Sequence, residues 1–247
     1  MLDGGEGLAG PSPSPDERAA HASASAVASD GSRLRPSLQA FVPLRERLFR
    51  RALARSLRGC DSVLDVGCGP ASPLEKVGYP GIAIGLDVSA HELRQAKRRG
   101  FHAGFIRADV ATLESVARPR SVDAVVALDL IEHLPRERAL RLLDTFERTA
   151  RRRVVVLTPN GFVPQPGTRE NPFQEHVSGF SVADMRAHGY RIRGVLGPWF
   201  LFGPFGDVRL RPGMVWRRVA DVTAPLVYPL PRTAFALLCT KDVGALR

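Results

Sequence analysis

The sequence has few cysteines, few lysines and no long hydrophobic run. Cys60, Cys68 and Cys239 lie far apart and form no CxxC pair, which argues against a disulfide scaffold and a thiolate zinc site. This pattern favours a reducing, cytoplasmic compartment. No stretch approaches the ~20 apolar residues that a spanning helix needs, and no basic segment followed by an apolar one opens the chain. We therefore expect neither a membrane span nor a secretory leader.

Arginine dominates the charge. Only Lys76, Lys97 and Lys241 are lysines among 35 basic residues, and the formal net charge is +10. Because this bias reflects codon composition as much as selection for phosphate contacts, it does not identify a nucleic-acid partner. The charge is equally compatible with acidic substrates and with anionic surfaces.

The composition changes abruptly near the start of the chain. Residues 1–31 contain five acids, one arginine and 20 Gly, Ala, Ser or Pro residues, which predicts a disordered tail. A wrongly assigned start site is the alternative. Residues 32–60 carry eight arginines and one acid, and the helical spacing of apolar residues from Leu38 to Leu57 predicts a basic amphipathic helix with Pro43 near its start. Its arginines either face water or contact anionic lipid or nucleic acid.

Residues 61–247 alternate short apolar runs with helical patterns. Strands rich in Val, Ile and Leu that alternate with helices predict an α/β, doubly wound, Rossmann-like domain with a mostly parallel sheet. A Pro/Gly/aromatic-rich insertion, residues 197–232, separates the last two strands. The predicted strands are Ser62–Val66, Ile82–Leu86, Phe105–Asp109, Asp123–Leu128, Val154–Thr158, Tyr190–Leu196 and Phe235–Thr240. The predicted helices are Pro73–Val77, Ala90–Arg99, Thr112–Ala117, Arg136–Ala150 and Ser181–Ala187.

A glycine loop follows the first strand of this domain. The strand carries Asp65 and runs into Gly67, Cys68 and Gly69. Glycines there permit a tight turn and close approach of the backbone to a ligand, at the place where doubly wound sheets bind nucleotide cofactors. The third glycine of the dinucleotide fingerprint is replaced by Ser72. A carboxylate before the loop favours a cationic ligand, so the motif indicates S-adenosylmethionine rather than NAD.

Acidic residues also follow the next three strands. Asp87, followed by Val88, is placed to accept both ribose hydroxyls of an adenosine. Asp109, followed by Val110, is placed to meet the adenine amino group. Asp129 follows the fourth strand. Because the carboxyl ends of parallel strands share one edge of the sheet, we expect all four acids to face one crevice.

These motifs resemble those of class I S-adenosylmethionine-dependent methyltransferases. The resemblance covers about residues 62–196 and implies S-adenosylmethionine as cofactor and a seven-stranded sheet whose last strand is antiparallel. Within the class, the chain is similar to the small-molecule methyltransferases that include ubiquinone-biosynthesis enzymes. Ala71 departs from the pattern, because many members carry a third glycine there. The resembling segments are Asp65–Gly69, Asp87, Asp109–Val110, Asp129–Leu134, Thr158–Asn160 and Glu175–Val177.

Two histidines are candidates for catalysis. A hydroxyl acceptor benefits from a general base, and imidazole titrates near neutral pH, which points to His133 and His176. The alternatives are a helix-start role for His133 and a loop-ordering role for His176. Asp129, Glu132 and His133 together also have the ligand types of a magnesium site, and some relatives with such a run bind magnesium there. Whether this chain binds a metal stays open at this point.

The acceptor is the least determined part of the prediction. The aromatic insertion at residues 197–232 either forms a packed lid over the pocket or a surface for an apolar acceptor. We expect O-methylation of a small molecule: a metabolite, a sugar or a lipid-linked compound. The alternatives are an RNA methyltransferase or RNA binder and a non-catalytic interaction module. Against the first, the arginines form no recognised RNA-binding module.

Overall fold

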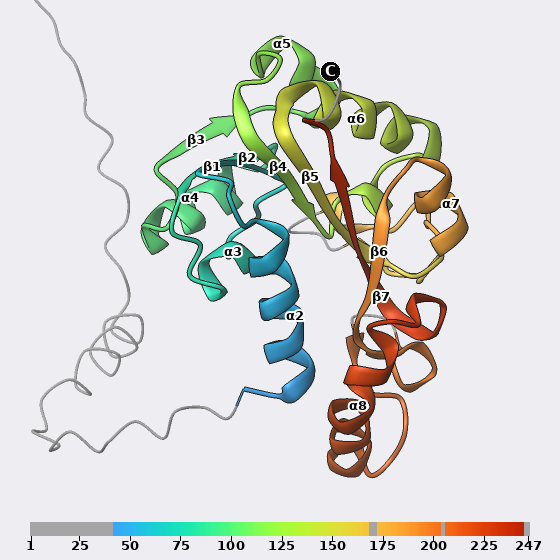
Figure 1. Ribbon diagram of the computed structural model, residues 1–247. Coiled ribbons are helices and arrows are strands. Elements are labelled where there is room, and N and C mark those ends of the chain that lie inside the picture. The colour runs from blue at the N-terminus through green and yellow to red at the C-terminus, as the bar shows by residue number, and fades with distance from the viewer. Residues whose placement is uncertain (1–41, 168–171, 204–205, 245–247) are drawn as a thin grey trace, which may run out of the picture. The chain divides into compact units, whose positions relative to one another are not determined.

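The computed structural model describes residues 42–167, 172–203 and 206–244, which build a seven-stranded sheet flanked by helices (Figure 1). The strand order is β3-β2-β1-β4-β5-β7-β6. Strands β1 to β5 run parallel, and β7 lies antiparallel between β5 and β6. The predicted Rossmann-like sheet with an antiparallel last strand is therefore confirmed. The strands are β1 Ser62–Val66, β2 Ile82–Asp87, β3 Gly104–Arg107, β4 Val122–Leu128, β5 Ala150–Pro159, β6 Arg191–Pro198 and β7 Ala234–Asp242.

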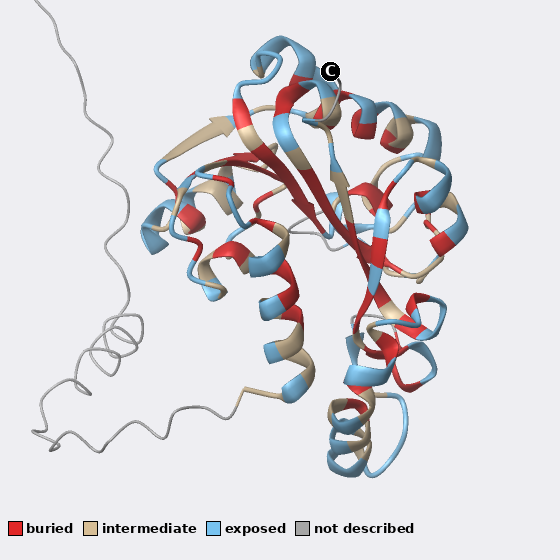
Figure 2. Cartoon of the chain, in the orientation of Figure 1, coloured by how far each residue is buried: buried red, intermediate tan, exposed pale blue. Residues whose placement is uncertain are grey.

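The central strands form the core because they are apolar on both faces. Figure 2 shows these strands in the buried colour, and Val63, Val125 and Val155 have no exposed surface. Strands that are covered on both sides need such continuous Val and Leu runs. The chain order reverses between β1 and β4, and ligands of doubly wound sheets bind at this switch point, beyond the carboxyl ends of the strands.

Helices cover both faces of the sheet. On one face α6 packs through Leu142 and Phe146, and on the other α2 packs through Phe49 and Leu53. Ser89 caps α4, since its side chain accepts a hydrogen bond from the Glu92 amide. The helices are α2 Leu44–Ser56, α3 Pro73–Lys76, α4 Ala90–Arg99, α5 Leu113–Val116, α6 Arg136–Thr149, α7 Val182–Ala187 and α8 Gly213–Val227. The 3-10 turns are η1 Val110–Thr112, η2 Ile131–His133, η3 Pro172–Gln174, η4 Trp199–Leu201 and η6 Pro231–Thr233.

All strands except β1 differ from the prediction by one or more residues at their ends, and β3 and β5 show a physical cause. Strand β3 stops at Arg107 because Asp109 caps the following 3-10 turn, with its carboxylate accepting from the Ala111 amide at 2.8 Å. Strand β5 begins before its apolar run. Arg151 and Arg153 at its start are held by carboxylates of neighbouring strands, Arg151 by Asp123 at 3.0 Å. Side-chain hydrogen bonds and ion pairs therefore explain why the end of β3 and the start of β5 differ from the predicted residues.

The insertion contains the main unpredicted element, helix α8. Its proline and glycine content hid the helix in the sequence, since Pro212 precedes it and Pro225 lies inside it. The helix packs against β6 and α2, and Arg45 of α2 pairs with Asp221 at 2.7 Å. The segment after α8 is fixed by Asn160, whose side-chain amide donates to the carbonyls of residues 231, 232 and 234.

Part of the predicted amino-terminal region lies outside the described residues. This holds for the tail, residues 1–31, and for residues 32–41 of the basic segment. The helix predicted in that segment is present as α2, with Pro43 at its amino end. Phe205 of the insertion also lies outside. Within the described ranges, no helix is both long enough and apolar enough to cross a membrane.

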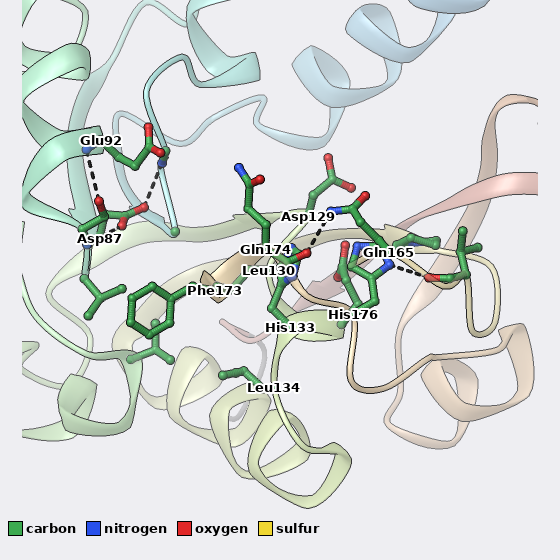
Figure 3. A pocket seen from close by; sticks show the side chains of 18 of the residues that line it. Asp87, Glu92, Asp129, Leu130, His133, Leu134, Gln165, Phe173, Gln174 and His176 are labelled. Atoms are coloured by element: carbon green, nitrogen blue, oxygen red, sulfur yellow. Dashed lines mark hydrogen bonds between the residues drawn. The ribbon is translucent and has the colours of Figure 1, made fainter. Parts of the chain in front are cut away.

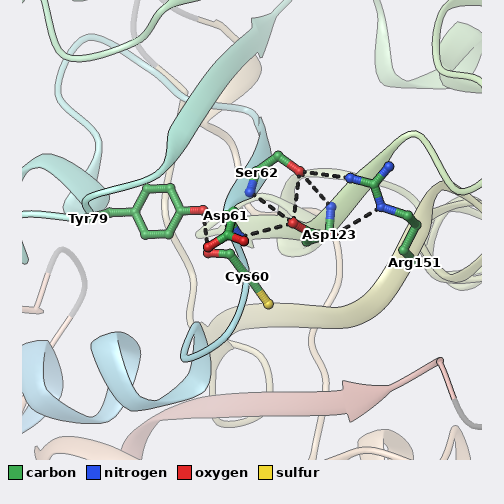
Figure 4. Close-up of polar contacts among 6 residues, drawn as sticks. All are labelled: Cys60, Asp61, Ser62, Tyr79, Asp123 and Arg151. Atoms are coloured by element: carbon green, nitrogen blue, oxygen red, sulfur yellow. Dashed lines mark hydrogen bonds and ion pairs between the residues drawn. The ribbon is translucent and has the colours of Figure 1, made fainter.

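A polar network joins β1 and β4 at the edge of the sheet opposite their carboxyl ends (Figure 4). Asp123 Oδ2 accepts from the amides of Asp61 and Ser62 at 2.9 and 3.2 Å, and Oδ1 accepts from Arg151 Nε. The pKa of Asp123 is lowered: burial opposes this shift, but the hydrogen bonds from the Asp61 amide and Arg151 outweigh burial. The network holds two central strands together away from the cavity.

Candidate functional site

A cavity of 740 Å³ lies at the carboxyl ends of the strands. Figure 3 shows Asp87 at one end of it and the pair His133 and His176 toward the other. The cavity brings together nine of the eleven residues that the sequence nominated. These are Gly67, Gly69, Asp87, Val88, Asp109, Val110, Asp129, His133 and His176. The other two, Asp65 and Cys68, are not among the described residues that line the cavity.

The glycine loop has a backbone that only glycine adopts easily. Gly67 and Gly69 have φ of +70° and +55°, in the left-handed region. A Cβ on Gly67 would lie 2.8 Å from Leu130 Cδ1, closer than carbon atoms tolerate. The amides of Gly67 and Cys68 donate to the Leu86 carbonyl at 2.7 and 3.1 Å, which ties the loop to β2. The loop therefore approaches the cavity as bare backbone.

Asp87 fixes this loop and still faces the cavity. Its Oδ2 accepts from the Gly69 amide at 3.0 Å, and its Oδ1 accepts from the Ser89 amide at 2.8 Å. An ionised carboxylate offers about four lone-pair sites, so acceptors remain for two hydroxyls of a ligand. This geometry fits the predicted ribose contact and also sets the start of α4.

Asp65 occupies a different place from the one predicted. Its carboxylate is buried behind the loop, and Oδ2 lies 2.9 Å from Nε2 of His102, with both side chains 2% exposed. The rings of Phe101 and Phe105 pack against His102. The Asp65 carboxylate therefore pairs with His102 beneath the loop, and its predicted contact with a cationic ligand stays a prediction. Nothing in the sequence indicated this pair, because His102 lies 37 residues after Asp65, just beyond α4, and belongs to no motif.

Cys68 is the second residue placed away from the cavity. Its side chain is 4% exposed and packs beneath β2, where a Cβ on Gly85 would lie 2.8 Å from its sulfur atom. Its contribution to the loop is the backbone amide. Cys68 does not line the cavity, and its predicted role in cofactor binding stays a prediction.

Asp109 lies at the edge of the cavity beside α6. Its Oδ1 accepts from the Ala111 amide and from Arg138 at 3.1 Å. Arg138 also lines the cavity, so a cation and a carboxylate share this corner. Both partners, the Ala111 amide and Arg138, bond to Oδ1, so the predicted adenine contact would have to use the other carboxylate oxygen, Oδ2.

Asp129 and Glu132 form an acidic pair after β4. Asp129 has φ of +59° and lines the cavity as an exposed residue, and desolvation by the surrounding protein raises its pKa to about 6. Glu132 is buried, and its Oε2 accepts from the Thr158 hydroxyl at 3.0 Å. Burial, followed by the charge of Asp129, raises the pKa of Glu132 well above its ordinary value.

Glu132 Oε1 is an orphaned acceptor. This atom is buried and has no hydrogen-bond partner among the described residues. Burying an unpaired acceptor lowers the stability of the fold unless the atom binds a proton or a cation. The main-chain carbonyl of Glu132 accepts from the amides of Val177 and Ser178, which joins the segment after β4 to the segment that carries His176.

His133 and His176 meet edge to face, with ring centroids 4.8 Å apart. Nδ1 of His133 lies 3.0 Å from the Glu175 carbonyl, and Nδ1 of His176 lies 2.7 Å from the Val163 carbonyl. Carbonyl oxygens only accept, so each Nδ1 carries the proton and each neutral ring keeps a lone pair on Nε2. Burial is the main cause that lowers the pKa of His133. One ligand atom each of Glu132, His133 and His176 lie within 4.8 Å of one another.

Sequence reasoning missed the residues between β5 and α7 that complete the cavity. Gln165, Phe173 and Gln174 line it, and Gln165 Nε2 donates to the Gln174 carbonyl at 2.9 Å. Leu196 and Phe235 close the side next to the insertion. Within the described part of the insertion, Gly206 lines the cavity, so a covering role of the whole insertion stays a prediction. These residues carry no periodic signal and no charge that would have marked them.

Comparisons with known proteins agree with this geometry. Residues 63–153 match a family model described as a methyltransferase domain, Methyltransf_25. No curated protein matches the chain. One similar solved structure is a SAM dependent methyltransferase from Archaeoglobus fulgidus, with a TM-score of 0.50 and 20% identity over 80% of this chain and 94% of that one. Another is the methyltransferase domain of bacterial CtHen1-C, with a TM-score of 0.51 and 15% identity over 82% of this chain and all of that one, 100%.

At these identities the structural likeness establishes the fold, and the family match covers its cofactor-binding half. The ubiquinone-biosynthesis subtype suggested by the resemblance is not among these findings. The methyltransferase-domain match over residues 63–153, the shared fold and the acidic strand ends around the glycine loop together support an S-adenosylmethionine-dependent methyltransferase.

Proposed function

We propose that the chain methylates a hydroxyl oxygen of a small-molecule acceptor that binds beside His133 and His176. The observation that carries this proposal is the state of the two imidazoles. Both Nδ1 atoms lie within hydrogen-bond distance of backbone carbonyls, so the neutral form of each ring presents its Nε2 lone pair as a base. A free amine or a thiolate already presents the lone pair that attacks the methyl group, whereas a hydroxyl must lose its proton.

The cofactor end of the cavity fits S-adenosylmethionine. The bare backbone of Gly67 and Gly69 and the carboxylate of Asp87 would hold its methionine and ribose parts. S-adenosylmethionine supplies an activated methyl group when bound. The protein aligns the acceptor with this group and excludes water, and His133 removes the hydroxyl proton onto Nε2. The lowered pKa of His133 keeps the ring neutral, and so able to accept that proton, at neutral pH.

A metal-assisted version of the same reaction is favoured by Glu132. Its orphaned Oε1, together with His133 and His176, offers one carboxylate and two imidazoles within 4.8 Å. Such a set suits a divalent transition metal better than magnesium, which prefers oxygen ligands. Both imidazoles have their outer N–H held by a carbonyl, as metal-ligating histidines usually do. The predicted grouping of Asp129, Glu132 and His133 thus changes to Glu132, His133 and His176.

An acceptor screen tests the proposal. Purified protein is incubated with radiolabelled S-adenosylmethionine and panels of phenols, sugars, lipid-linked compounds, amines and RNA. We expect label in a hydroxyl compound, and its loss in His133→Ala. Label only in amines or RNA would contradict a hydroxyl acceptor. Repeating the assay with a chelator and then with added Mn²⁺, Zn²⁺ or Mg²⁺ separates the two mechanisms, and elemental analysis of Glu132→Gln reports the metal independently of activity.

A further inference from the structure

Helix α8 presents an inverted distribution of side chains. Its buried residues are Ala220, Ala224 and Val227, while several larger apolar side chains are exposed. Met214, Val222 and Leu226 are 78%, 73% and 64% exposed. A surface helix ordinarily turns its large apolar residues to the core and polar residues to water. Figure 2 shows α8 mostly in the exposed and intermediate colours.

These residues lie along one side of the helix, with Arg218 between Val215 and Val222. Val215, Val222 and Leu226 recur at spacings that keep them on one side of a helix, and Met214 adjoins them. Leu230, 58% exposed, extends the stripe beyond the helix. Single exposed apolar residues need no explanation, but a contiguous patch with a polar rim marks an interaction site. We refer to Met214, Val215, Val222, Leu226 and Leu230 as the α8 stripe.

Arginines are concentrated in α2 and in the segment that contains α8. Helix α2 lies beside α8 (Figure 1), and residues 42–58 and 206–232 together contain eleven arginines against Glu46, Asp207 and Asp221, a net charge of +8. This is most of the net charge of the whole chain, +10. Glu46 and Asp221 are engaged by Arg50 and Arg45 within the same region. Exposed arginines such as Arg217 and Arg218 lie on α8 itself.

We infer that the α8 stripe and its arginines dock the protein on an anionic membrane surface. Apolar side chains enter the boundary between headgroups and acyl chains, while arginines at its margin meet anionic headgroups. A second copy of the chain is a poorer occupant. A two-fold contact through this side of α8 would bring two positively charged surfaces together, which disfavours association. This peripheral docking is independent of which acceptor the enzyme methylates.

The test is sedimentation of the full chain with lipid vesicles. We expect binding to vesicles of phosphatidylcholine mixed with phosphatidylglycerol, no binding to phosphatidylcholine alone, and release by salt. Val222→Glu/Leu226→Glu should abolish binding. Val116→Glu, which alters an exposed valine on α5, is the matched control and should retain it. Arg217→Gln/Arg218→Gln should weaken binding by ~25-fold, since each basic residue contributes about fivefold at an anionic surface. Arg98→Gln/Arg118→Gln removes the same charge elsewhere and should retain binding.

Three outcomes would overturn the inference. The first is binding that survives Val222→Glu/Leu226→Glu but disappears when residues 1–41 are removed, which would assign docking to that segment. The second is a stable dimer of the wild-type chain that does not bind vesicles and that dissociates in Val222→Glu. The third is absence of vesicle binding by the wild-type chain. Calorimetric titration with S-adenosylhomocysteine verifies that each variant is folded. Loss of vesicle binding can therefore be told apart from unfolding of the protein.

Discussion

Asp87 is the residue whose replacement tests the cofactor site most directly. In Asp87→Ala the ligand loses the acceptor for its ribose hydroxyls. Hydrogen bonds to a charged group contribute about 1.5–3 kcal/mol, so their loss should raise the dissociation constant by ~10- to 150-fold. The substitution also removes the acceptors of the Gly69 and Ser89 amides. Two lost hydrogen bonds at about 1 kcal/mol each predict a melting temperature lowered by roughly 4–8 °C.

Calorimetry with S-adenosylhomocysteine measures the affinity, and thermal unfolding without ligand measures the stability. Asp144→Ala is a suitable control, because Asp144 is an exposed acid on α6 outside the cavity. It should leave both quantities unchanged. An Asp87→Ala protein that is folded and binds with wild-type affinity would refute the assignment of Asp87 to the ribose. A fall in melting temperature without a fall in affinity would leave Asp87 a purely structural residue of the loop.

Three further predictions concern single residues. His133→Ala should lower turnover by ~10²–10⁴-fold with little change in cofactor affinity, measured by radiolabel transfer and calorimetry; a proportional loss of affinity would make His133 a binding residue. Gly67→Ala places a Cβ 2.8 Å from Leu130 Cδ1 at φ of +70°, so it should destabilise the fold by ~1–3 kcal/mol in urea unfolding and weaken cofactor binding, whereas an unaltered unfolding curve would show that the loop relaxes. Asp123→Asn should cost about 1–2 kcal/mol at pH 7 without affecting cofactor affinity. Because the folded-state pKa of Asp123 is depressed, its contribution is present above about pH 4 and is lost as pH falls through the folded pKa, so wild type and variant should converge in acid; a difference that persists at low pH would contradict the charge-based explanation.

The sheet was predictable because its signals are local. The apolar runs of β1, β2 and β4 are continuous, and the Ser89 cap and Gly100 bracket α4 at the predicted residues Ala90–Arg99. The glycine loop was predictable for the same reason: one short segment contains the residues whose backbone needs glycine.

The remaining site features depend on contacts between distant residues. The pairing of Asp65 with His102 and the meeting of His133 with His176 bring together residues that share no pattern in the sequence. The burial of Glu132 is likewise set by Thr158 and by the segment after β5. No periodicity encodes such contacts, because tertiary packing alone decides them.

The left-handed backbone of Asp129 limits how this position can be probed. At φ of +59°, aspartate and asparagine are tolerated because their short polar side chains bond locally, whereas alanine incurs a penalty of about 1–2 kcal/mol from its Cβ. Asp129→Ala would therefore change the backbone and the charge at once. Asp129→Asn removes only the charge, and Asp129→Gly removes the side chain while easing the backbone. Comparing these two variants separates what the carboxylate does for the reaction from what the turn does for the fold.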